Sequence, residues 1–220
     1  QVIVYPAAGG YTDRLIAEAS SVHTKPAELD FEHAAGLLLV GGTAADLVAT
    51  AGVGSGDVVL IHGGAGAVGT IAVQLAVRAG ASVIATASPA NHTFLAGLGA
   101  VPVAYGPGLL DRVTDAATGP VTASVDTVGT DEAVDVSLAL VADRARIATI
   151  AAFGRADAGI KALGGGPGAD PGTEIRTAAR PELARLAADG VLRVVIARTY
   201  PLAEVVDAVR FVREGHAGGK

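Results

Sequence analysis

The residues best suited to chemistry form a glycine-rich turn. Gly64, Gly66 and Gly69 fit the spacing GxGxxG, directly after a β-branched run, Val58 to Ile61, and before a helical stretch, Val68 to Ala79. In such a strand–turn–helix unit the glycines permit a tight turn, a close approach to a pyrophosphate and close packing of helix on strand. The helix N-terminus adds free N–H groups and partial positive charge. The turn is therefore predicted to hold a dinucleotide; the alternative is a glycine-rich loop without a ligand.

Two other nucleotide motifs are absent from the sequence. A Walker loop requires a lysine after its last glycine, but Gly69 is followed by Thr70 and Ile71. The Tyr-xxx-Lys pair of short-chain dehydrogenases is missing too, because no tyrosine has a lysine four residues later. Neither ATP or GTP chemistry nor a short-chain dehydrogenase is therefore expected.

The end of the next expected strand bears on the choice of cofactor. NAD enzymes usually place an acid there to hold the ribose hydroxyls, but residues 86–92 read TASPANH and contain no acid. The hydroxyl of Ser88, the amide of Asn91 and the imidazole of His92 can instead donate to a 2′-phosphate. This favours NADP over NAD, although the usual arginine is missing. The alternatives are that Ser88 caps the following helix and that His92 faces solvent.

Strands and helices alternate through the middle of the chain, which predicts βαβ units and an α/β, doubly wound parallel sheet of the Rossmann type. The expected strands are Val58 to Ile61, Ser82 to Ala87, Val101 to Ala104, Ala123 to Asp126 and Arg146 to Ala151; the helices between them are Val68 to Ala79, Asn91 to Leu98, Leu109 to Ala117 and Asp131 to Val141.

The flanks follow a different pattern. Before the βαβ series we expect two strands, Val2 to Pro6 and Tyr11 to Glu18, and then a helical stretch from Phe31 to Ala51 that is interrupted at Gly41–Gly42. After the series we expect a loop at Gly164 to Gly172, a helix at Thr173 to Asp189, a strand at Val194 to Thr199, and a helix at Leu202 to Glu214 that ends at Gly215.

Composition excludes several classes of protein. Half of the 220 residues are apolar and 17% are charged, which is ample for a buried core and excludes disorder. The net charge of −6 and the absence of a basic run exclude a nucleic-acid surface. The most apolar stretch, Gly36 to Ala45, ends at Asp46 and is too short to cross a bilayer. We expect a soluble, cytoplasmic protein with no membrane partner and no signal peptide.

A metal site is not expected. The chain has no cysteine, and its five histidines show no close pair at metal-ligand spacing. They are interpreted as isolated surface or strand-end imidazoles: His23, His33, His62, His92 and His216. His62 precedes the glycine turn and is expected to pack or to cap there.

One stretch, GDVVLIHGGAGAVGTIAVQLAVRAGASVIATAS (Gly56 to Ser88), resembles the cofactor-binding core of the medium-chain dehydrogenase/reductase superfamily, in its zinc-independent quinone oxidoreductase (zeta-crystallin-like) branch. The likeness continues in GGYTDRLIAEASSVHTKP (Gly9 to Pro26), LLLVGGTAADLV (Leu37 to Val48), DTVG (Asp126 to Gly129) and ARTYPLAEVVDAVRFVREGHAGGK (Ala197 to Lys220). It covers nearly the whole chain.

The resemblance implies a role for each matching residue. Thr43 would lie near the nicotinamide, Gly66 to Gly69 would hold the pyrophosphate, and Ser88 and His92 would take the 2′-phosphate, with His92 where the family usually has lysine. Tyr105 would border the adenosine ribose, while Val128 and the backbone of Ala151, Ala152 and Phe153 would line the nicotinamide. The predicted cofactor-binding residues are therefore Thr43, Gly64, Ala65, Gly66, Ala67, Val68, Gly69, Ser88, His92, Tyr105, Val128, Ala151 and Phe153.

Structural alternatives stay open for three residues. Tyr105 is alternatively a half-buried core aromatic, Asp126 a strand-end cap, and Thr43 a cap at a helix break.

The resemblance also implies a domain organisation. Family members wrap the Rossmann domain between two parts of a GroES-like catalytic domain. Residues 1–35 would be a remnant of that domain, 36–190 the Rossmann domain and 191–220 the return segment. The chain begins with Gln1 rather than Met and starts near the last strands of the larger part. We therefore expect an N-terminally truncated chain whose catalytic residues are unknown.

The implied function is an NADPH-dependent oxidoreductase that transfers hydride to a small-molecule substrate: a quinone, an enone or a similar activated double bond. The alternatives are a non-catalytic NADP-binding module and an inactive fragment of such an enzyme. By family analogy we expect a homodimer joined through edge strands, for which Gly159 to Leu163 is the candidate edge.

Overall fold

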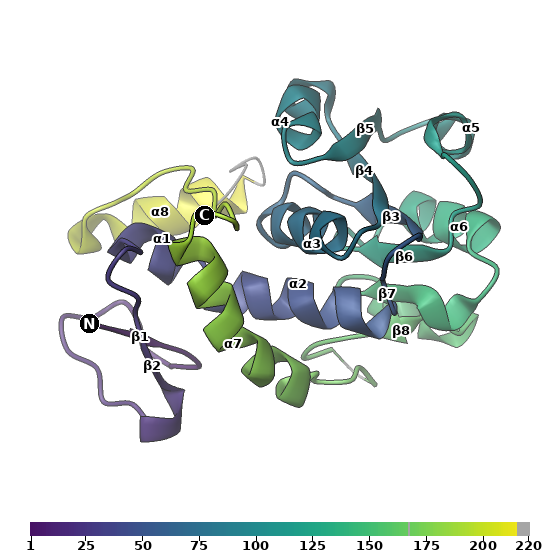
Figure 1. Cartoon of the computed structure of the whole chain (residues 1–220). Helices are drawn as coiled ribbons and strands as arrows, with labels where there is room; N and C mark the ends of the chain where they lie inside the picture. The colour runs from purple at the N-terminus through teal and green to yellow at the C-terminus, as the bar shows by residue number, and fades with distance from the viewer. Residues whose placement is uncertain (167, 215–220) are drawn as a thin grey trace.

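The computed structural model describes residues 1–166 and 168–214, and a parallel sheet of six strands forms its centre (Figure 1). The strand order is β5-β4-β3-β6-β7-β8, and every neighbouring pair is parallel. This confirms the predicted doubly wound α/β fold. The strands are β3 (Val58–His62), β4 (Ser82–Ala87), β5 (Ala100–Ala104), β6 (Ala123–Asp126), β7 (Ile147–Thr149) and β8 (Lys161–Ala162).

Helices cover both faces of the sheet. Alternate residues of β3 point to opposite faces, and on each face they pack against a different set of helices. Val59 and Ile61 belong to one buried cluster, and Val58 and Leu60 belong to another. The first cluster includes side chains of α2 (Leu38–Thr50), α3 (Ala67–Arg78), α4 (His92–Ala96) and α7 (Thr173–Ala188); the second includes side chains of α5 (Leu109–Ala116) and α6 (Asp131–Leu140). Short 3₁₀ turns complete the connections: η2 (Pro89–Asn91), η3 (Arg144–Arg146) and η4 (Phe153–Ala158).

The order of the strands creates a crevice beside β3. The chain runs from β3 outward to β4 and β5, and then returns to β6 on the other side of β3. The connections therefore leave β3 and β6 in opposite directions. In open α/β sheets, ligands bind at such a switch point, outside the carboxyl ends of the strands.

The predicted helix interruption at Gly41–Gly42 is wrong. Helix α1 (Phe31–Ala35) ends at Gly36, and α2 runs without a break through both glycines. The reason is tertiary: a Cβ on Gly41 would lie 3.1 Å from Leu183 Cδ1, so the missing side chain lets α7 pack closely on α2. This packing outweighs the low helix propensity of glycine.

Two predicted strands in the flanks are also wrong. Strand β1 (Val2–Val4) pairs antiparallel with β2 (Val22–Thr24), and no strand forms over residues 11–18. Residues 194–199 are not a strand either. The preceding backbone is held by a side chain instead, since Gln74 accepts from the N–H of Arg193 at 2.7 Å and donates to its carbonyl at 2.9 Å.

The last described helix is α8 (Val205–Arg213), which follows η5 (Leu202–Glu204), and η1 (Ala19–Ser21) precedes β2. The predicted helix end at Gly215 and the imidazole of His216 lie outside the described residues. Within residues 1–166 and 168–214, no helix combines the length and the apolar character needed to cross a membrane.

Candidate functional site: a glycine turn and a cavity at the switch point

The glycine turn after β3 is tied to the end of β4. The N–H of Gly63 donates to Thr86 Oγ1 at 3.1 Å, and the N–H of Gly64 donates to the Thr86 carbonyl at 3.0 Å. Gly63 has a φ of +73°, a conformation that favours glycine. The N–H of Gly66 then donates to the Gly63 carbonyl at 3.0 Å and closes the turn.

Two glycines of the turn, Gly64 and Gly69, are required for close packing. A Cβ on Gly64 would lie 2.8 Å from Ala85 Cβ, and one on Gly69 would collide with the Gly63 carbonyl. A Cβ on Gly66 would lie 3.3 Å from Gly63 O. Gly64 therefore lets the turn pack against β4, and Gly69 lets α3 sit against the turn. Gly66 leaves its backbone open at the start of the helix.

The N-terminus of α3 has no side-chain cap, because its N-cap residue is Gly66. The first N–H groups of an α-helix have no partner inside the helix, and together with the helix dipole they favour an anion. Ala65 and Gly66 line a cavity at this point. The local geometry thus fits a pyrophosphate group.

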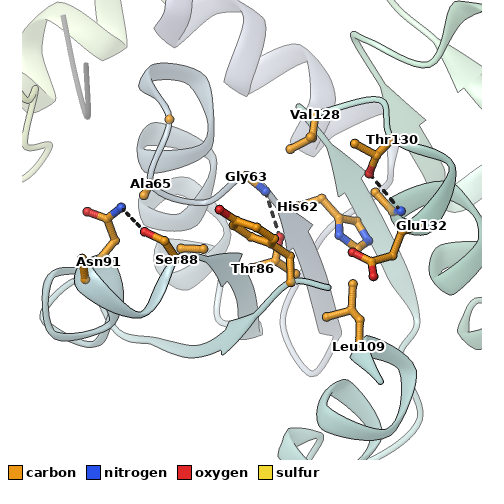
Figure 2. Close-up of a pocket in the computed structure, with 15 residues that line it drawn as sticks. His62, Gly63, Ala65, Thr86, Ser88, Asn91, Leu109, Val128, Thr130 and Glu132 are labelled. Carbon is orange, nitrogen blue, oxygen red and sulfur yellow. Dashed lines mark hydrogen bonds between the residues drawn. The ribbon is translucent and has the colours of Figure 1, made fainter. Parts of the chain in front are cut away.

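That cavity has a volume of about 740 Å³ and lies over the carboxyl ends of β3, β4, β5 and β6 (Figure 2). Its size is typical of small-molecule sites. Its lining residues are His62, Gly63, Ala65, Gly66, Thr86, Ala87, Ser88, Ala90, Asn91, Tyr105, Leu109, Val128, Thr130, Glu132 and Ala133.

At the β4 end of the cavity stand Ser88 and Asn91 (Figure 2). Ser88 Oγ accepts from Asn91 Nδ2 at 3.1 Å and makes no capping bond to the following 3₁₀ turn. His92 does not line the cavity, and its Nε2 lies 3.4 Å from the carbonyl of Ala87. Asn91, whose amide was named from the sequence as a possible donor to a 2′-phosphate, thus lines the cavity beside Ser88.

At the β6 end, His62, Thr130 and Glu132 line the cavity, and the sequence analysis predicted no ligand role for any of them. His62 is 1% exposed, and its Nε2 lies 3.1 Å from Ser137 Oγ. Burial lowers the pKa of His62 to about 4, against the opposing charges of Asp126 and Glu132. The imidazole is therefore neutral at pH 7, and the expectation that His62 packs in place is met.

Asp126 shapes the loop that carries Val128 into the cavity. Its Oδ1 accepts from the N–H groups of Val128 and Gly129, at 2.9 and 3.0 Å, and its Oδ2 accepts from Thr149 Oγ1 at 2.7 Å. Asp126 is 1% exposed. The carboxylate is thus a strand-end cap, as one interpretation of the sequence held.

The structure brings together only some of the predicted cofactor residues. Ala65, Gly66, Ser88, Tyr105 and Val128 line one cavity, while Gly64, Ala67, Val68 and Gly69 belong to the turn and to the first turn of α3 without lining it. Tyr105 is 61% exposed and is not a core aromatic.

Three further predicted residues lie outside this cavity: Thr43, Ala151 and Phe153. Thr43 lies inside α2 and donates to the carbonyl of Leu39 at 2.9 Å, so it caps no helix break. Ala151 follows β7, and its N–H donates to Thr149 Oγ1 at 3.1 Å. Phe153 begins η4.

No group of three or more His, Cys, Asp or Glu side chains that could hold a metal ion occurs among the residues that the structure describes.

The fold and the turn at its switch point define a Rossmann-type α/β protein. The family model described as zinc-binding dehydrogenase matches residues 98–220. The chain therefore belongs to this family, within the medium-chain dehydrogenase/reductase superfamily and its quinone oxidoreductase-like branch, as the sequence likeness indicated.

Solved structures agree with this assignment. A quinone oxidoreductase from Coxiella burnetii is 32% identical, with a TM-score of 0.74 over 93% of this chain and 64% of that one. A mycobacterial protein complexed with NADPH is 28% identical, with a TM-score of 0.80 over 97% and 70%. The Escherichia coli quinone oxidoreductase complexed with NADPH is 25% identical, with a TM-score of 0.78 over 97% and 71%.

Curated relatives match shorter segments. A polyketide synthase, GfsB of Streptomyces halstedii, is 42% identical over 93 residues, which are 42% of this chain and 2% of that protein. The quinone oxidoreductase of Sus scrofa is 39% identical over 80 residues, which are 36% of this chain and 24% of that protein. The matches thus span less than a third of these relatives.

Proposed function

We propose that the chain binds NADPH in the cavity at the switch point. The observation that carries this proposal is the combination of an uncapped helix N-terminus with a hydroxyl and an amide, Ser88 and Asn91, at the end of β4. A carboxylate at that position would repel a 2′-phosphate, whereas these groups can donate to it. Two structural neighbours are named as NADPH complexes, which supports the same cofactor.

Each part of the cavity has a proposed role. Gly66 and the first turn of α3 hold the pyrophosphate. Ser88 and Asn91, with His92 beside them, hold the 2′-phosphate. Tyr105 and Val128 contribute apolar wall to the cavity. The nicotinamide would extend beyond this cavity, toward Thr43, Ala151 and Phe153.

The activity we propose is hydride transfer to a quinone, an enone or a similar activated double bond. Bound NADPH supplies the hydride, and the chain's own residues bind and orient the dinucleotide. Names among the relatives support this class of substrate: the quinone oxidoreductase of Sus scrofa and a 2-methylene-furan-3-one reductase of Solanum lycopersicum. The polyketide synthase relatives are compatible with reduction inside a larger multidomain protein.

The activity test uses the intact protein that contains this chain. We expect it to oxidise NADPH when a quinone or an enone is added, and to do so at a lower rate with Gly66→Ala. NADPH binding without turnover of any such acceptor would favour the second candidate, a non-catalytic dinucleotide-binding module. Absence of NADPH binding to the intact protein would contradict both.

We also propose a cytoplasmic homodimer, in which β8 of one copy pairs with β8 of the other. This rests on family analogy and on the position of β8 at the end of the sheet order. Light scattering should give the mass of a dimer, and Lys161→Pro, which places a proline in β8, should give a monomer. A monomer before the substitution would contradict the pairing.

A further inference from the structure

The hydrogen bonds of Ser137 determine which nitrogen of His62 carries the proton. The Ser137 hydroxyl donates to the carbonyl of Ala133 at 2.8 Å, and Ser124 Oγ lies 2.8 Å from Ser137 Oγ. A hydroxyl has one proton to donate, so Ser137 Oγ can only accept from His62 Nε2 at 3.1 Å. His62 is therefore the neutral tautomer with Nε2–H, and its Nδ1 carries a free lone pair.

This Nδ1 faces the cavity. Among residues 1–166 and 168–214, this nitrogen has no hydrogen-bond partner. In that part of the chain, the buried side-chain atoms without a partner are Arg176 Nη2 and Arg180 Nε, so His62 Nδ1 is not a buried atom. It is thus reachable from the cavity that His62 lines. Figure 2 shows the imidazole on the wall between Gly63 and Glu132.

Glu132, which lines the same cavity, presents a second acceptor. Its Oε2 accepts from the N–H of Gly106 at 2.9 Å, which holds the carboxylate in place. Its Oε1 has no hydrogen bond within the described part of the chain. This oxygen is not among the buried atoms that lack a partner, so it is accessible. Both side chains line the cavity (Figure 2), and the charge of Glu132 acts on the imidazole of His62. Two fixed acceptors therefore stand at one end of the cavity with no donor between them.

The cavity between this pair and the glycine turn has apolar walls, to which Ala87, Leu109 and Val128 contribute. A flat aromatic base would fit such walls, and its polar edge would have to supply donors to the two acceptors. The 6-amino group of adenine has two N–H donors, whereas a 6-oxo purine presents lone pairs there.

We infer that His62 and Glu132 select the adenine base of the cofactor by accepting hydrogen bonds from its 6-amino group. The inference rests on the proposed binding of NADPH in this cavity and adds a specificity-determining pair to it. A site built to bind a donor rejects the analogue that lacks it, because its own buried acceptors lose their partners.

The test compares NADPH with its 6-oxo analogue, reduced nicotinamide hypoxanthine dinucleotide phosphate, by titration of the full 220-residue chain. We expect the analogue to bind at least about tenfold more weakly. Equal dissociation constants would contradict the inference and leave the proposed function intact. Absence of NADPH binding would contradict the proposed function itself.

Two variants assign the preference to this pair. His62→Gln keeps a donor to Ser137 and removes the Nδ1 acceptor, so the preference for NADPH should fall. Glu132→Gln keeps an oxygen for Gly106 and turns an N–H group toward the base, so the 6-oxo analogue should gain affinity. A merely structural role would weaken both ligands without this gain.

The matched control is Ser88→Ala, at the opposite end of the cavity. It should weaken both ligands by the same factor, because both carry the 2′-phosphate. A preference that persists unchanged in both His62→Gln and Glu132→Gln would overturn the assignment to these residues.

Discussion

The hydroxyl of Thr86 accepts a hydrogen bond from the N–H of Gly63 at 3.1 Å, and this bond connects the end of β4 to the glycine turn after β3. Thr86 is 3% exposed. Thr86→Val keeps the β-branched shape and removes the acceptor, so the Gly63 N–H loses its partner. We expect the free energy of unfolding to fall by about 1–2 kcal/mol, measured by urea denaturation.

The same substitution should also weaken NADPH binding, because the turn that faces the pyrophosphate loses one of its two bonds to β4. Thr86→Ser is the matched control, since it retains the hydroxyl. If the valine variant equalled the serine variant in both stability and affinity, the bond would have no role in shaping the site.

Gly66→Ala separates binding from folding. The added Cβ would lie 3.3 Å from Gly63 O, a contact that a small shift relieves, and the backbone φ of −73° suits alanine. The methyl group would nevertheless occupy the surface against which we propose that the pyrophosphate lies. We expect NADPH affinity to drop at least about tenfold, with little change in the midpoint of thermal unfolding.

Gly119→Ala is the control for Gly66→Ala, because a Cβ there has no atom within 4 Å. It should change neither quantity. Full NADPH affinity in Gly66→Ala would place the cofactor elsewhere.

The parallel sheet and its glycine turn could be predicted because their signals are local. A β-branched run, a GxGxxG spacing and a helical stretch follow one another directly, and β6 was predicted with its observed bounds, Ala123–Asp126. The alternation of such units determines the class of fold without knowledge of any long-range contact.

The features that escaped prediction depend on contacts between distant residues. In the sequence, Gly41 has the character of a helix breaker. In the structure, the space where its side chain would lie is filled by Leu183, 142 positions later in the chain. His62 could be recognised as packed, but its free Nδ1 follows from Ser137, which lies 75 residues away. Ser88 was found because it follows a strand, whereas the cavity role of Glu132 depends on its bond to Gly106.

Stability should depend on pH through His62. Its folded pKa of about 4 lies below its ordinary value of 6.5, so the unfolded chain binds a proton that the folded chain does not. The free energy of unfolding should therefore fall as pH drops from 6.5 to about 4, by at most about 1.4 kcal/mol per pH unit. Below that range the folded state is protonated too, and this contribution levels off.

The carboxyl of Asp57 acts at lower pH. A side-chain hydrogen bond from Arg146 lowers its pKa, so its contribution is lost only below its ordinary value of 3.8. Urea denaturation across the acidic range, with His62→Gln for comparison, distinguishes the two groups. A variant whose stability falls as steeply as that of the unchanged chain above pH 4.5 would show that His62 is not the titrating group.

The central claim is that the cavity at the switch point binds a dinucleotide with a 2′-phosphate, and the ratio of the dissociation constants of NADPH and NADH tests it most directly. We predict that NADPH binds at least about tenfold more tightly, and that Ser88→Asp reverses the preference, because a carboxylate there repels the phosphate and accepts from the ribose hydroxyls. Equal constants in the unchanged chain, or a preference that Ser88→Asp leaves untouched, would contradict the account.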